Sequence, residues 1–437
     1  MSPQSLSVCL LNDSFPPAID GVANAVVNYA RIIHRELGSA VVAVPDYPDV
    51  KDDYPFPVVR YPSVDTTGII GYRAGYPFSA KTLGTLVGAA PDIIHSHCPV
   101  MSTAMARTLR ERIDVPVVFT YHTKFDIDIR RAISGHLLQK TAIRLLVDNI
   151  SACDEVWVVS RGAGENLRSL GYEGDYIVMD NGVDFPRGRV PEEEAAALRQ
   201  EIGIGQDTPV YLFVGRLMWY KGIRIILDAM AALKAAGDDF RMVFVGDGME
   251  REEMEAYVHA LGLDGLCLFQ GAVRDREKLR AYFCMSDLFL FPSTFDTNGI
   301  VVREAAACGL GSALIRGSCA AEGTADGVNA YHIEEDAQSL TRLLRQVGHD
   351  RAALRSLGER AMDELYLSWE ESVRRAYDRY GVVLDDYKRG LTGRNLEWSD
   401  EVYNLMSDLC RNIELARSFR EVHSRRRRQR RTRRMDR

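Results

Sequence analysis

Two cations in a glycine-bounded turn are the first residues with an evident chemical use. The segment Gly215-Arg216-Leu-Met-Trp-Tyr-Lys221-Gly222 directly follows Val210–Val214, an apolar run typical of a buried β-strand. An arginine and a lysine at the end of a strand can neutralise a diphosphate, and the arginine can also form bidentate hydrogen bonds with it. The alternative interpretation is a pair of solvated surface cations.

A second segment, Asp296-Thr-Asn-Gly299-Ile-Val-Val-Arg-Glu304, contains two carboxylates. Asp296 falls in a loop after the apolar run Leu288–Phe291, and Glu304 falls in the helix that we expect next. A loop carboxylate beside the free N–H groups of a helix start can hold sugar hydroxyls, and Glu304 can accept both hydroxyls of a ribose. An exposed acidic helix start is the alternative.

The third segment, Pro16-Pro-Ala-Ile-Asp20-Gly21, ends where a helix is expected to begin. Its apolar residues Val22, Val26, Ala30, Ile33 and Leu37 share one face, and Gly38 stands where a C′ glycine belongs. A helix start attracts anions, and Gly21 would let a phosphate approach the backbone, although an ordinary N-terminal turn explains the segment alone. Together the three segments combine anion-binding turns with a hydroxyl-binding pair, as a sugar nucleotide requires.

Several weaker motifs predict no cofactor and no metal. The Gly-x-Gly turns at 162–164 and 246–248 lack the third glycine of a dinucleotide fingerprint. His95-Ser-His97 has no third ligand near it in the sequence, and the carboxylates of Asp126-Ile-Asp128 are explained by a helix's first turn.

The elements that must position these residues alternate between strands and helices, which indicates parallel sheets covered on both faces. We expect an α/β fold of two doubly wound Rossmann-like domains facing across a cleft, with a helical C-terminal extension. The expected strands are Ser5–Leu11, Ala40–Val44, Asp92–His95, Val115–Thr120, Asp154–Val159, Tyr176–Met179, Val210–Val214, Arg241–Val245, Leu266–Gln270, Leu288–Phe291 and Ser312–Ile315.

Composition shifts divide the chain into five expected parts. Residues 1–190 form an N-terminal acceptor-side domain, 191–208 a linker, and 209–365 a C-terminal donor-binding domain. Residues 366–424 are expected as helices, including an amphipathic one that starts after Ser399, and 425–437 as a disordered Arg-rich tail.

The charge is unevenly distributed along the 437 residues. The formal net charge is −7, yet residues 425–437 alone carry nine Arg and one Asp, so the remainder stands at −15. An acidic body repels polyanions, and the tail has no aromatic residues for base stacking, so we expect no nucleic-acid partner. The segment 124–148 has a net charge of +2 among apolar residues. With the tail, it predicts contact with an anionic membrane surface, although a solvated helix face is equally compatible.

The chain is expected to be cytoplasmic, or peripheral on the cytoplasmic face of a membrane. Eight cysteines are scattered without a CxxC pair, mostly within apolar stretches, which is typical of buried thiols in a reducing compartment. The N-terminus MSPQSLSVCLLND has no basic region of a signal peptide, and no apolar run approaches the ~20 residues of a membrane span.

Five motifs together resemble glycosyltransferase family 4, the retaining sugar transferases with two Rossmann domains (GT-B). They are FPPAIDGVANAVVNYAR, DNGVD, GRLMWYKG, VGDG and FPSTFDTNGIVVREAAACG, and the resemblance covers roughly residues 5–380. The resemblance implies that Arg216 and Lys221 bind the donor diphosphate and that Gly21 adds a backbone contact to it. It also implies that the transferred sugar is held by Asp296 and by the backbone of Thr297, Asn298, Gly299 and Ile300. Glu304 would accept hydrogen bonds from the ribose hydroxyls, and His122 would face the reacting sugar or the diphosphate.

Two departures from the family pattern bear on substrates. Asp296 stands where Glu is usual, which leaves the donor sugar open. An Asp-Gly pair replaces the common Gly-Gly at 20–21, as in relatives that glycosylate diacylglycerol and make sulfolipid, and this places Asp20 on the acceptor side with His122 and Lys124. The resemblance therefore favours transfer of glucose or galactose from a UDP-sugar to diacylglycerol, with retention and without a metal.

Two alternatives remain. One is the same chemistry on a soluble sugar or a polysaccharide acceptor. The other is a non-catalytic scaffold with a nucleic-acid-binding tail, which the presence of Arg216, Lys221, Asp296 and Glu304 argues against.

Overall fold

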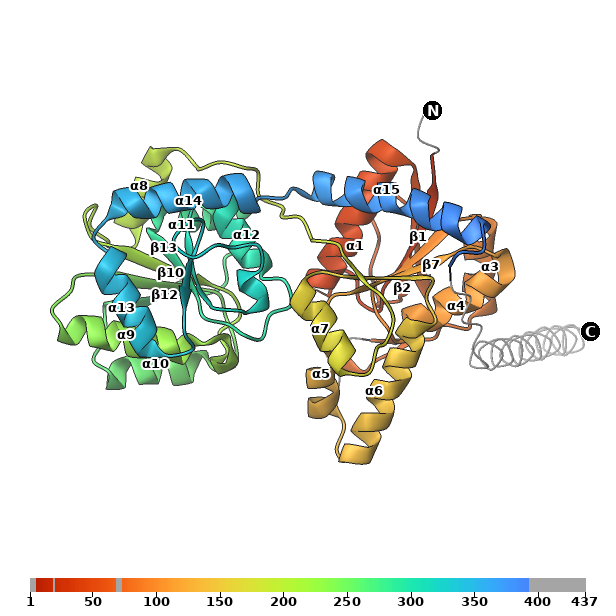
Figure 1. The fold of residues 1–437 in the computed structure, drawn as a ribbon, viewed down its shortest axis with the longest axis horizontal. Coiled ribbons are helices and arrows are strands. Elements are labelled where there is room, and N and C mark those ends of the chain that lie inside the picture. The colour runs from red at the N-terminus through yellow and green to blue at the C-terminus, as the bar shows by residue number, and fades with distance from the viewer. Residues whose placement is uncertain (1–4, 19, 68–72, 393–437) are drawn as a thin grey trace, which may run out of the picture. The chain divides into compact units, whose positions relative to one another are not determined.

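All described strands except the short pair β4–β5 assemble into two parallel sheets, one in each of two structural units (Figure 1). The computed structural model describes residues 5–18, 20–67 and 73–392. Among these described residues, the first unit comprises those up to 159, 163–179 and 373–392, and the second comprises 160–162 and 180–372. The helix expected after Ser399 and the Arg-rich segment 425–437 lie outside the described residues.

The first unit is built on a sheet in the order β3-β2-β1-β6-β7-β8-β9, with all neighbours parallel. These strands are β1 (Ser7–Leu11), β2 (Ser39–Pro45), β3 (Val58–Tyr61), β6 (Ile93–Ser96), β7 (Val117–Tyr121), β8 (Glu155–Val158) and β9 (Ile177–Val178), and β4 (Ser63–Val64) pairs antiparallel with β5 (Ala74–Gly75). The helices are α1 (Gly21–Ile32), α3 (Ala80–Gly88), α4 (Met101–Ile113), α5 (Phe125–Ala132), α6 (His136–Ser151) and α7 (Arg161–Ser169), joined by part of α15 (Trp369–Lys388).

Alternate strand residues of this sheet point to opposite faces, and both faces are buried. On one face, Cys9, Ile94 and Phe119 belong to a core that also contains residues of α3, α4, α6 and α7. On the other face, His95 and Trp157 make ring contacts with Tyr29 of α1 and Tyr380 of α15. The near-continuous apolar runs of the sequence follow from this double coverage.

Helix α15 belongs to the first unit from residue 373 onward, which corrects the prediction that residues 366–424 form a separate extension. The reason is a row of tyrosines on its buried side. The Tyr377 hydroxyl accepts a hydrogen bond from the Leu6 amide at 2.5 Å, and the Tyr387 hydroxyl donates to Asp114 at 2.9 Å. These contacts tie the last described helix to Leu6 at the beginning of the chain and to Asp114 at the end of α4.

The second unit repeats the same topology, with the parallel order β12-β11-β10-β13-β14-β15. Its strands are β10 (Val210–Val214), β11 (Arg241–Val245), β12 (Cys267–Phe269), β13 (Leu288–Phe291), β14 (Ser312–Ile315) and β15 (Tyr331–Ile333). Its helices are α8 (Glu192–Glu201), α9 (Ile223–Ala235), α10 (Arg251–Ala260), α11 (Arg276–Met285), α12 (Ile300–Ala307), α13 (Ala337–Val347) and α14 (Arg351–Leu365).

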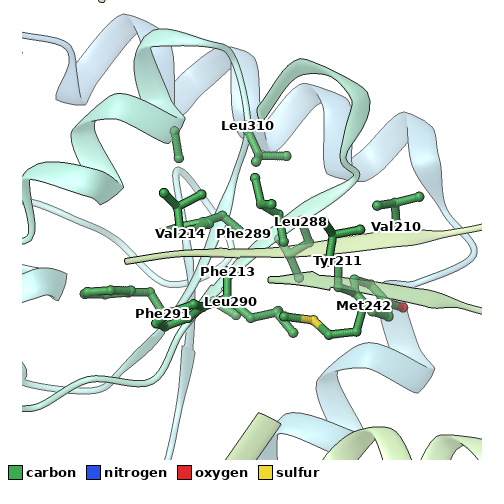
Figure 2. Packing of buried hydrophobic residues seen from close by; sticks show 14 of the residues in the cluster. Val210, Tyr211, Phe213, Val214, Met242, Leu288, Phe289, Leu290, Phe291 and Leu310 are labelled. Atoms are coloured by element: carbon green, nitrogen blue, oxygen red, sulfur yellow. The ribbon is translucent and has the colours of Figure 1, made fainter. Parts of the chain in front are cut away.

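Helices cover both faces of this sheet too. In Figure 1, α9, α10 and α13 lie on one side of the strands and α8, α11, α12 and α14 on the other. Figure 2 shows the core between these layers, where Phe213, Met242 and Phe289 are completely buried. Burial of this apolar surface, at about 25 cal/mol per Å², is the main force that holds the unit together.

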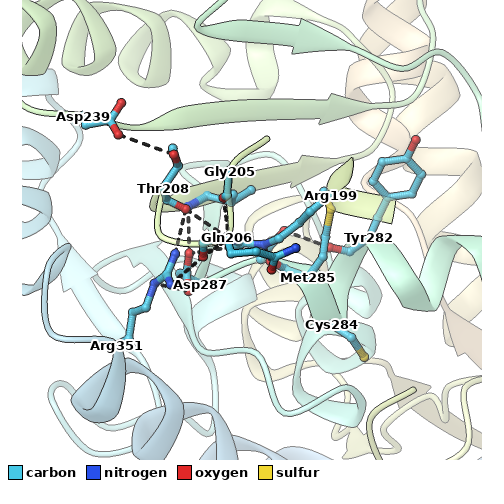
Figure 3. Close-up of polar contacts among 12 residues, drawn as sticks. Arg199, Gly205, Gln206, Thr208, Asp239, Tyr282, Cys284, Met285, Asp287 and Arg351 are labelled. Atoms are coloured by element: carbon cyan, nitrogen blue, oxygen red, sulfur yellow. Dashed lines mark hydrogen bonds and ion pairs between the residues drawn. The ribbon is translucent and has the colours of Figure 1, made fainter. Parts of the chain in front are cut away.

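The segment 191–208 is part of the second unit, so the predicted linker is wrong, and the chain crosses between units at 179/180 instead of 190/191. Figure 3 shows why: Arg199 of α8 and Arg351 of α14 meet at Asp287, with nitrogen–oxygen distances of 3.0 and 3.3 Å. Both guanidinium groups also donate to the backbone oxygens of Gln206 and Thr208. These bonds fix the segment against the edge of the sheet where the strands begin.

The expected strands are all present, with ends that match or shift by at most two residues, but β3, β15 and the short pair β4–β5 were not predicted. The expected helix after Gly21 changes to a π-helical turn over Ile33–Leu37. Gly38 does not adopt the left-handed conformation of a C′ glycine, because its φ is −173°. Its glycine identity is explained by close packing, since a Cβ there would lie 2.2 Å from the Leu6 oxygen and 2.5 Å from the Tyr377 hydroxyl.

Replacing Gly38 by alanine is therefore expected to destabilise the protein by about 1–3 kcal/mol, because backbone and a buried tyrosine must move. Gly84→Ala in α3 is the matched control: its Cβ would meet no described atom within 4 Å, and alanine favours a helix by about 1 kcal/mol. Thermal unfolding of the full chain should show a lower midpoint for Gly38→Ala and an equal or higher one for Gly84→Ala. Equal midpoints in both variants would contradict the packing described for Gly38.

Candidate functional site

In each sheet the strand order reverses direction beside the first strand, between β1 and β6 and between β10 and β13. Ligands of doubly wound folds bind at the carboxyl ends of the strands at such a switch point. In the second unit, β10 is followed by the turn with Arg216 and Lys221, and β13 by the loop with Asp296. The topology thus brings the two predicted donor segments to one place on one edge.

The turn after β10 presents one exposed and one buried cation. Arg216 is exposed, and no polar partner of its side chain is found among the described residues. Lys221 ends a 3₁₀ turn, Trp219–Lys221, whose first amide donates to the Glu250 carboxylate at 2.5 Å. Only 8% of Lys221 is exposed. The turn therefore leaves Arg216 ready to meet an anion and holds Lys221 inside the unit.

Lys221 forms an ion pair with Asp296, with 2.5 Å between Nζ and Oδ1. The second carboxylate oxygen of Asp296 accepts a hydrogen bond from the Ser293 hydroxyl, also at 2.5 Å. The rings of Phe291 and Phe295 lie 5.9 and 5.8 Å from the ammonium group. Two residues predicted to bind different parts of a donor thus contact one another directly. Ser293 was missed in the sequence, where only its spacing of three residues before Asp296 could have drawn attention to it.

The loop that follows Asp296 contains a buried polar group without a partner. Asn298 is 8% exposed, and its Nδ2 donates no hydrogen bond to any described residue. Gly299 has a φ of +60°, and a Cβ there would lie 3.0 Å from Ala320, so both backbone and packing favour glycine before α12 begins at Ile300. After the next strand, β14, the buried Ser318 hydroxyl also lacks a partner within the described part of the chain. Such groups are rare in folded proteins, and a ligand is one way to satisfy them.

Glu304 lies in α12, with its side chain 12% exposed. Its Oε1 accepts a hydrogen bond of 2.7 Å from Arg276, the first residue of α11. Burial raises the pKa of the Glu304 carboxyl, while Arg276 acts in the opposite direction. The sequence predicted Glu304 as a site residue but missed Arg276, which precedes it by 28 positions.

The predicted residues of the first unit also follow strands at their carboxyl ends. Asp20 is the N-cap of α1, where its Oδ1 accepts from the Ala23 amide at 2.7 Å. A Cβ at Gly21 would meet no described atom within 4 Å, so its backbone is open to approach. Lys124 is the N-cap residue of α5, and its side chain makes no capping bond. Asp20 therefore has a structural role independent of any acceptor.

His122 follows β7 and is buried in a row of histidines. His97 and His122 are joined by a hydrogen bond of 2.9 Å between Nδ1 and Nε2. His95 is held at both ring nitrogens, by Tyr380 at 2.5 Å and Thr120 at 2.7 Å. Burial lowers the pKa of His122 to about 3 and those of the other two well below the usual range, so all three rings are neutral near pH 7.

Other features delimit the site. In residues 5–18, 20–67 and 73–392, no cluster of three or more His, Cys, Asp or Glu side chains is arranged to hold a metal ion. A cavity of about 530 Å³ is lined by Arg189, Arg199, Asp287 and Arg355. Asp287 precedes β13, so this cavity lies at the amino ends of the strands, away from Arg216 and Asp296. Within the same described ranges, no helix is long and apolar enough to cross a bilayer.

Two family models match successive parts of the chain. "Glycosyltransferase Family 4" matches residues 19–187, and "Glycosyl transferases group 1" matches residues 194–364. The chain is similar to an alpha-monoglucosyldiacylglycerol synthase of Streptococcus pneumoniae, with 22% identity over 70% of each chain. It is also similar to the sulfoquinovosyl transferase SQD2 of Arabidopsis thaliana, with 26% identity over 83% of this chain and 72% of the relative.

Among solved structures, Anabaena Alr3699/HepE in complex with UDP aligns with a TM-score of 0.68 and 19% identity, covering 86% of this chain and all of that one. The same protein in complex with UDP-glucose aligns with a TM-score of 0.65 and 18% identity over 87% of this chain and 100% of that one. These likenesses confirm the fold that was predicted, two Rossmann-like halves of the GT-B type.

The fold and the two matches define a GT-B glycosyltransferase, and hence a hexosyltransferase enzyme. The chain belongs to glycosyltransferase family 4, in the branch that resembles diacylglycerol glycosyltransferases and sulfoquinovosyl transferases.

The ion pair between Lys221 and Asp296 is expected to stabilise the fold even without substrate, so substitutions of the two residues should not be additive. Lys221→Gln and Asp296→Asn should each destabilise the protein, and the double variant should be less destabilised than the sum, with a coupling of about 1–3 kcal/mol. Chemical denaturation of the wild type, the two single variants and the double variant measures this. Additive effects would contradict the direct contact.

Proposed function

We propose that the protein is a retaining glycosyltransferase that moves a hexose from a nucleotide-sugar donor to an acceptor hydroxyl. The observation that carries this proposal is the convergence of Arg216, Lys221 and Asp296 on the two loops that flank the switch point of the second sheet. This arrangement offers positive charge for a diphosphate beside a carboxylate for sugar hydroxyls.

The donor would be divided among these groups as follows. Arg216 and Lys221 bind the diphosphate, with a backbone contact from Gly21. Asp296 and the backbone of residues 297–300 hold the hexose, and the unpartnered Asn298 Nδ2 donates a hydrogen bond to an oxygen of the hexose. Glu304 accepts hydrogen bonds from the two ribose hydroxyls.

In the proposed mechanism, negative charge develops on the departing diphosphate, and Arg216 and Lys221 are already in place to stabilise it. His122 stays neutral at physiological pH and faces the reacting sugar as a hydrogen-bonding group. Asp296 is a poor candidate for a covalent nucleophile, because an ammonium and a hydroxyl already engage its two oxygens. We therefore favour substitution on the same face of the sugar, assisted by the leaving group, with no metal required.

For the donor we propose UDP-glucose or UDP-galactose, and for the acceptor diacylglycerol. The UDP and UDP-glucose complexes of HepE support the first part, and the names of the two relatives, a glucosyldiacylglycerol synthase and a sulfoquinovosyl transferase, support the second. The lipid acceptor would require contact with a bilayer from the cytoplasmic side.

Helix α6 supports such contact. Leu137, Leu138 and Leu145 are 77%, 63% and 62% exposed, which is unusual for leucine in a soluble helix. Lys140 and Arg144 lie between them in the sequence, so apolar and basic groups share this helix. A surface of this composition can insert leucines among lipid chains while its cations meet anionic headgroups. The basic segment 425–437 would add to the attraction.

The proposed reaction is tested by screening UDP- and GDP-sugars for donor hydrolysis and then offering each accepted donor with diacylglycerol or soluble sugars. We expect hydrolysis of a UDP-hexose and a glycosylated diacylglycerol product with the donor's anomeric configuration. Transfer to a soluble sugar alone would contradict the lipid acceptor, and inversion would contradict the mechanism.

Arg216→Ala is expected to lower kcat by about 10²–10³-fold, because it removes charge stabilisation from the leaving group. Arg345→Ala provides a control: this guanidinium is also exposed, but it pairs with Asp238, which precedes β11 at the opposite edge of the sheet. Initial rates with the accepted donor should fall only for Arg216→Ala, while both variants keep the wild-type unfolding temperature. A near-normal rate in Arg216→Ala would refute its assigned role.

Replacing Leu137, Leu138 and Leu145 together by serine is expected to weaken binding to anionic vesicles by about tenfold or more, since several buried CH₂ groups are lost at about 0.8 kcal/mol each. Serine at Val64 and Val382, two other exposed apolar residues, is the control and should leave binding unchanged. Vesicle sedimentation in phosphatidylglycerol-containing bilayers measures both. Equal binding of the leucine variant and the control would exclude α6 as the membrane contact.

A further inference from the structure

Arg276 lies beside the carboxylate that the proposed function assigns to ribose. Its Nη2 donates to Glu304 Oε1 at 2.7 Å and lies 3.7 Å from Asp184. Its guanidinium carbon lies 4.2 Å from the centre of the Phe185 ring. All four residues belong to the second unit.

The backbone of Arg276 is fixed by the start of α11. Asp275 is the N-cap of this helix, and its Oδ1 accepts from the amides of Glu277 and Lys278 at 3.0 and 3.2 Å. The Arg276 side chain therefore extends from a fixed backbone position, and the Phe185 ring packs against one face of its guanidinium group. This geometry holds a guanidinium against Glu304 before any ligand arrives.

Glu304 needs such a partner to act as an acceptor. Two hydroxyl donors require an ionised carboxylate, because a protonated carboxyl group loses one acceptor position and gains a donor. Two features of the site oppose ionisation, namely the burial of the side chain and the neighbouring carboxylate of Asp184. Arg276 is the cation that opposes them. Its bond occupies Oε1, and within the described part of the chain no hydrogen bond to Oε2 is found.

We infer that Arg276 is a positioning residue of the donor site, which holds Glu304 as an oriented, charged acceptor for the vicinal hydroxyls of the nucleotide ribose. This inference rests on the proposed function, because it takes Glu304 as the ribose-binding residue. Arg276 then acts on the donor through Glu304, and donor binding depends on the protonation state of the Glu304 carboxyl group.

The sign of the pH dependence follows from the charges. Loss of Arg276 leaves burial and Asp184 to act on Glu304 unopposed, so the pKa of its carboxyl rises. Nucleotide affinity then decreases as the pH falls through this higher pKa. A smaller fraction of Glu304 is then ionised at acidic pH. We therefore expect Arg276→Gln to weaken UDP binding about tenfold or more at the acidic end of the pH range, and less at its upper end.

The experiment is calorimetric titration of the full-length protein with UDP, and with GDP in parallel, from pH 5 to pH 8. The variants are Arg276→Gln, Arg276→Lys and Glu304→Gln. Lys278→Gln is the matched control, because it removes a cation from the same helix whose partner is Glu201 at 2.9 Å. Lys278→Gln should follow the wild-type profile, Arg276→Lys should restore most of it, and Glu304→Gln should bind weakly without the pH break.

A second ligand separates positioning from general structural effects. UDP that lacks both ribose hydroxyls gives Glu304 nothing to accept, so its affinity should be the same for wild type and Arg276→Gln at every pH. An equal loss with both ligands, or an unshifted pH profile in Arg276→Gln, would overturn the inference while leaving the proposed function intact. Failure of the wild type to bind either UDP or GDP would overturn both.

Discussion

The parallel direction of all strands in the two large sheets is the constraint on which the rest of this structure depends. Because neighbouring strands run the same way, every loop after a strand lies at one edge, and residues far apart in the sequence meet there. Arg216 and Asp296 follow β10 and β13, and Asn298 and Ser318 leave buried polar groups without described partners at the same edge. The opposite edge has a different task. There, Arg199, Asp287 and Arg351 fasten the segment that enters the second unit.

Electrostatics then decides what this edge can bind. The formal charge of residues 1–424 is −15, so binding of a diphosphate by the body of the protein requires cations at defined positions. Without ligand, the second unit balances its charges internally, by pairing Lys221 with Asp296 and Arg276 with Glu304. Each pair thereby holds a cation and a carboxylate in fixed positions. In our proposal the donor enters a site whose charged groups are already oriented, which lowers the cost of ordering them.

Sequence patterns were sufficient for most strands of the two parallel sheets and for the family, because apolar strands and glycine turns are local features. They placed Arg216, Lys221, Asp296 and Glu304 on the correct loops and helix, and they located the start of α1. They could not reveal Arg276 or Ser293, whose importance comes from contacts with residues that only the fold brings near. The same limit explains the errors in domain boundaries. The Pro- and Glu-rich segment 191–208 has the composition of a linker, but Arg199 bonds it to the second unit. Helix α15 follows the last predicted strand, but Tyr377 bonds it to Leu6 of the first unit.

In our proposal, the carboxyl edge of the second sheet binds the nucleotide-sugar donor. The decisive test is a crystal structure of the full-length protein with UDP. We expect the diphosphate to contact Arg216 and Lys221 and the ribose hydroxyls to contact Glu304, with Arg276 still bonded to the Glu304 carboxylate. UDP bound instead in the cavity lined by Arg189 and Arg355, or with its ribose away from Glu304, would refute this donor site.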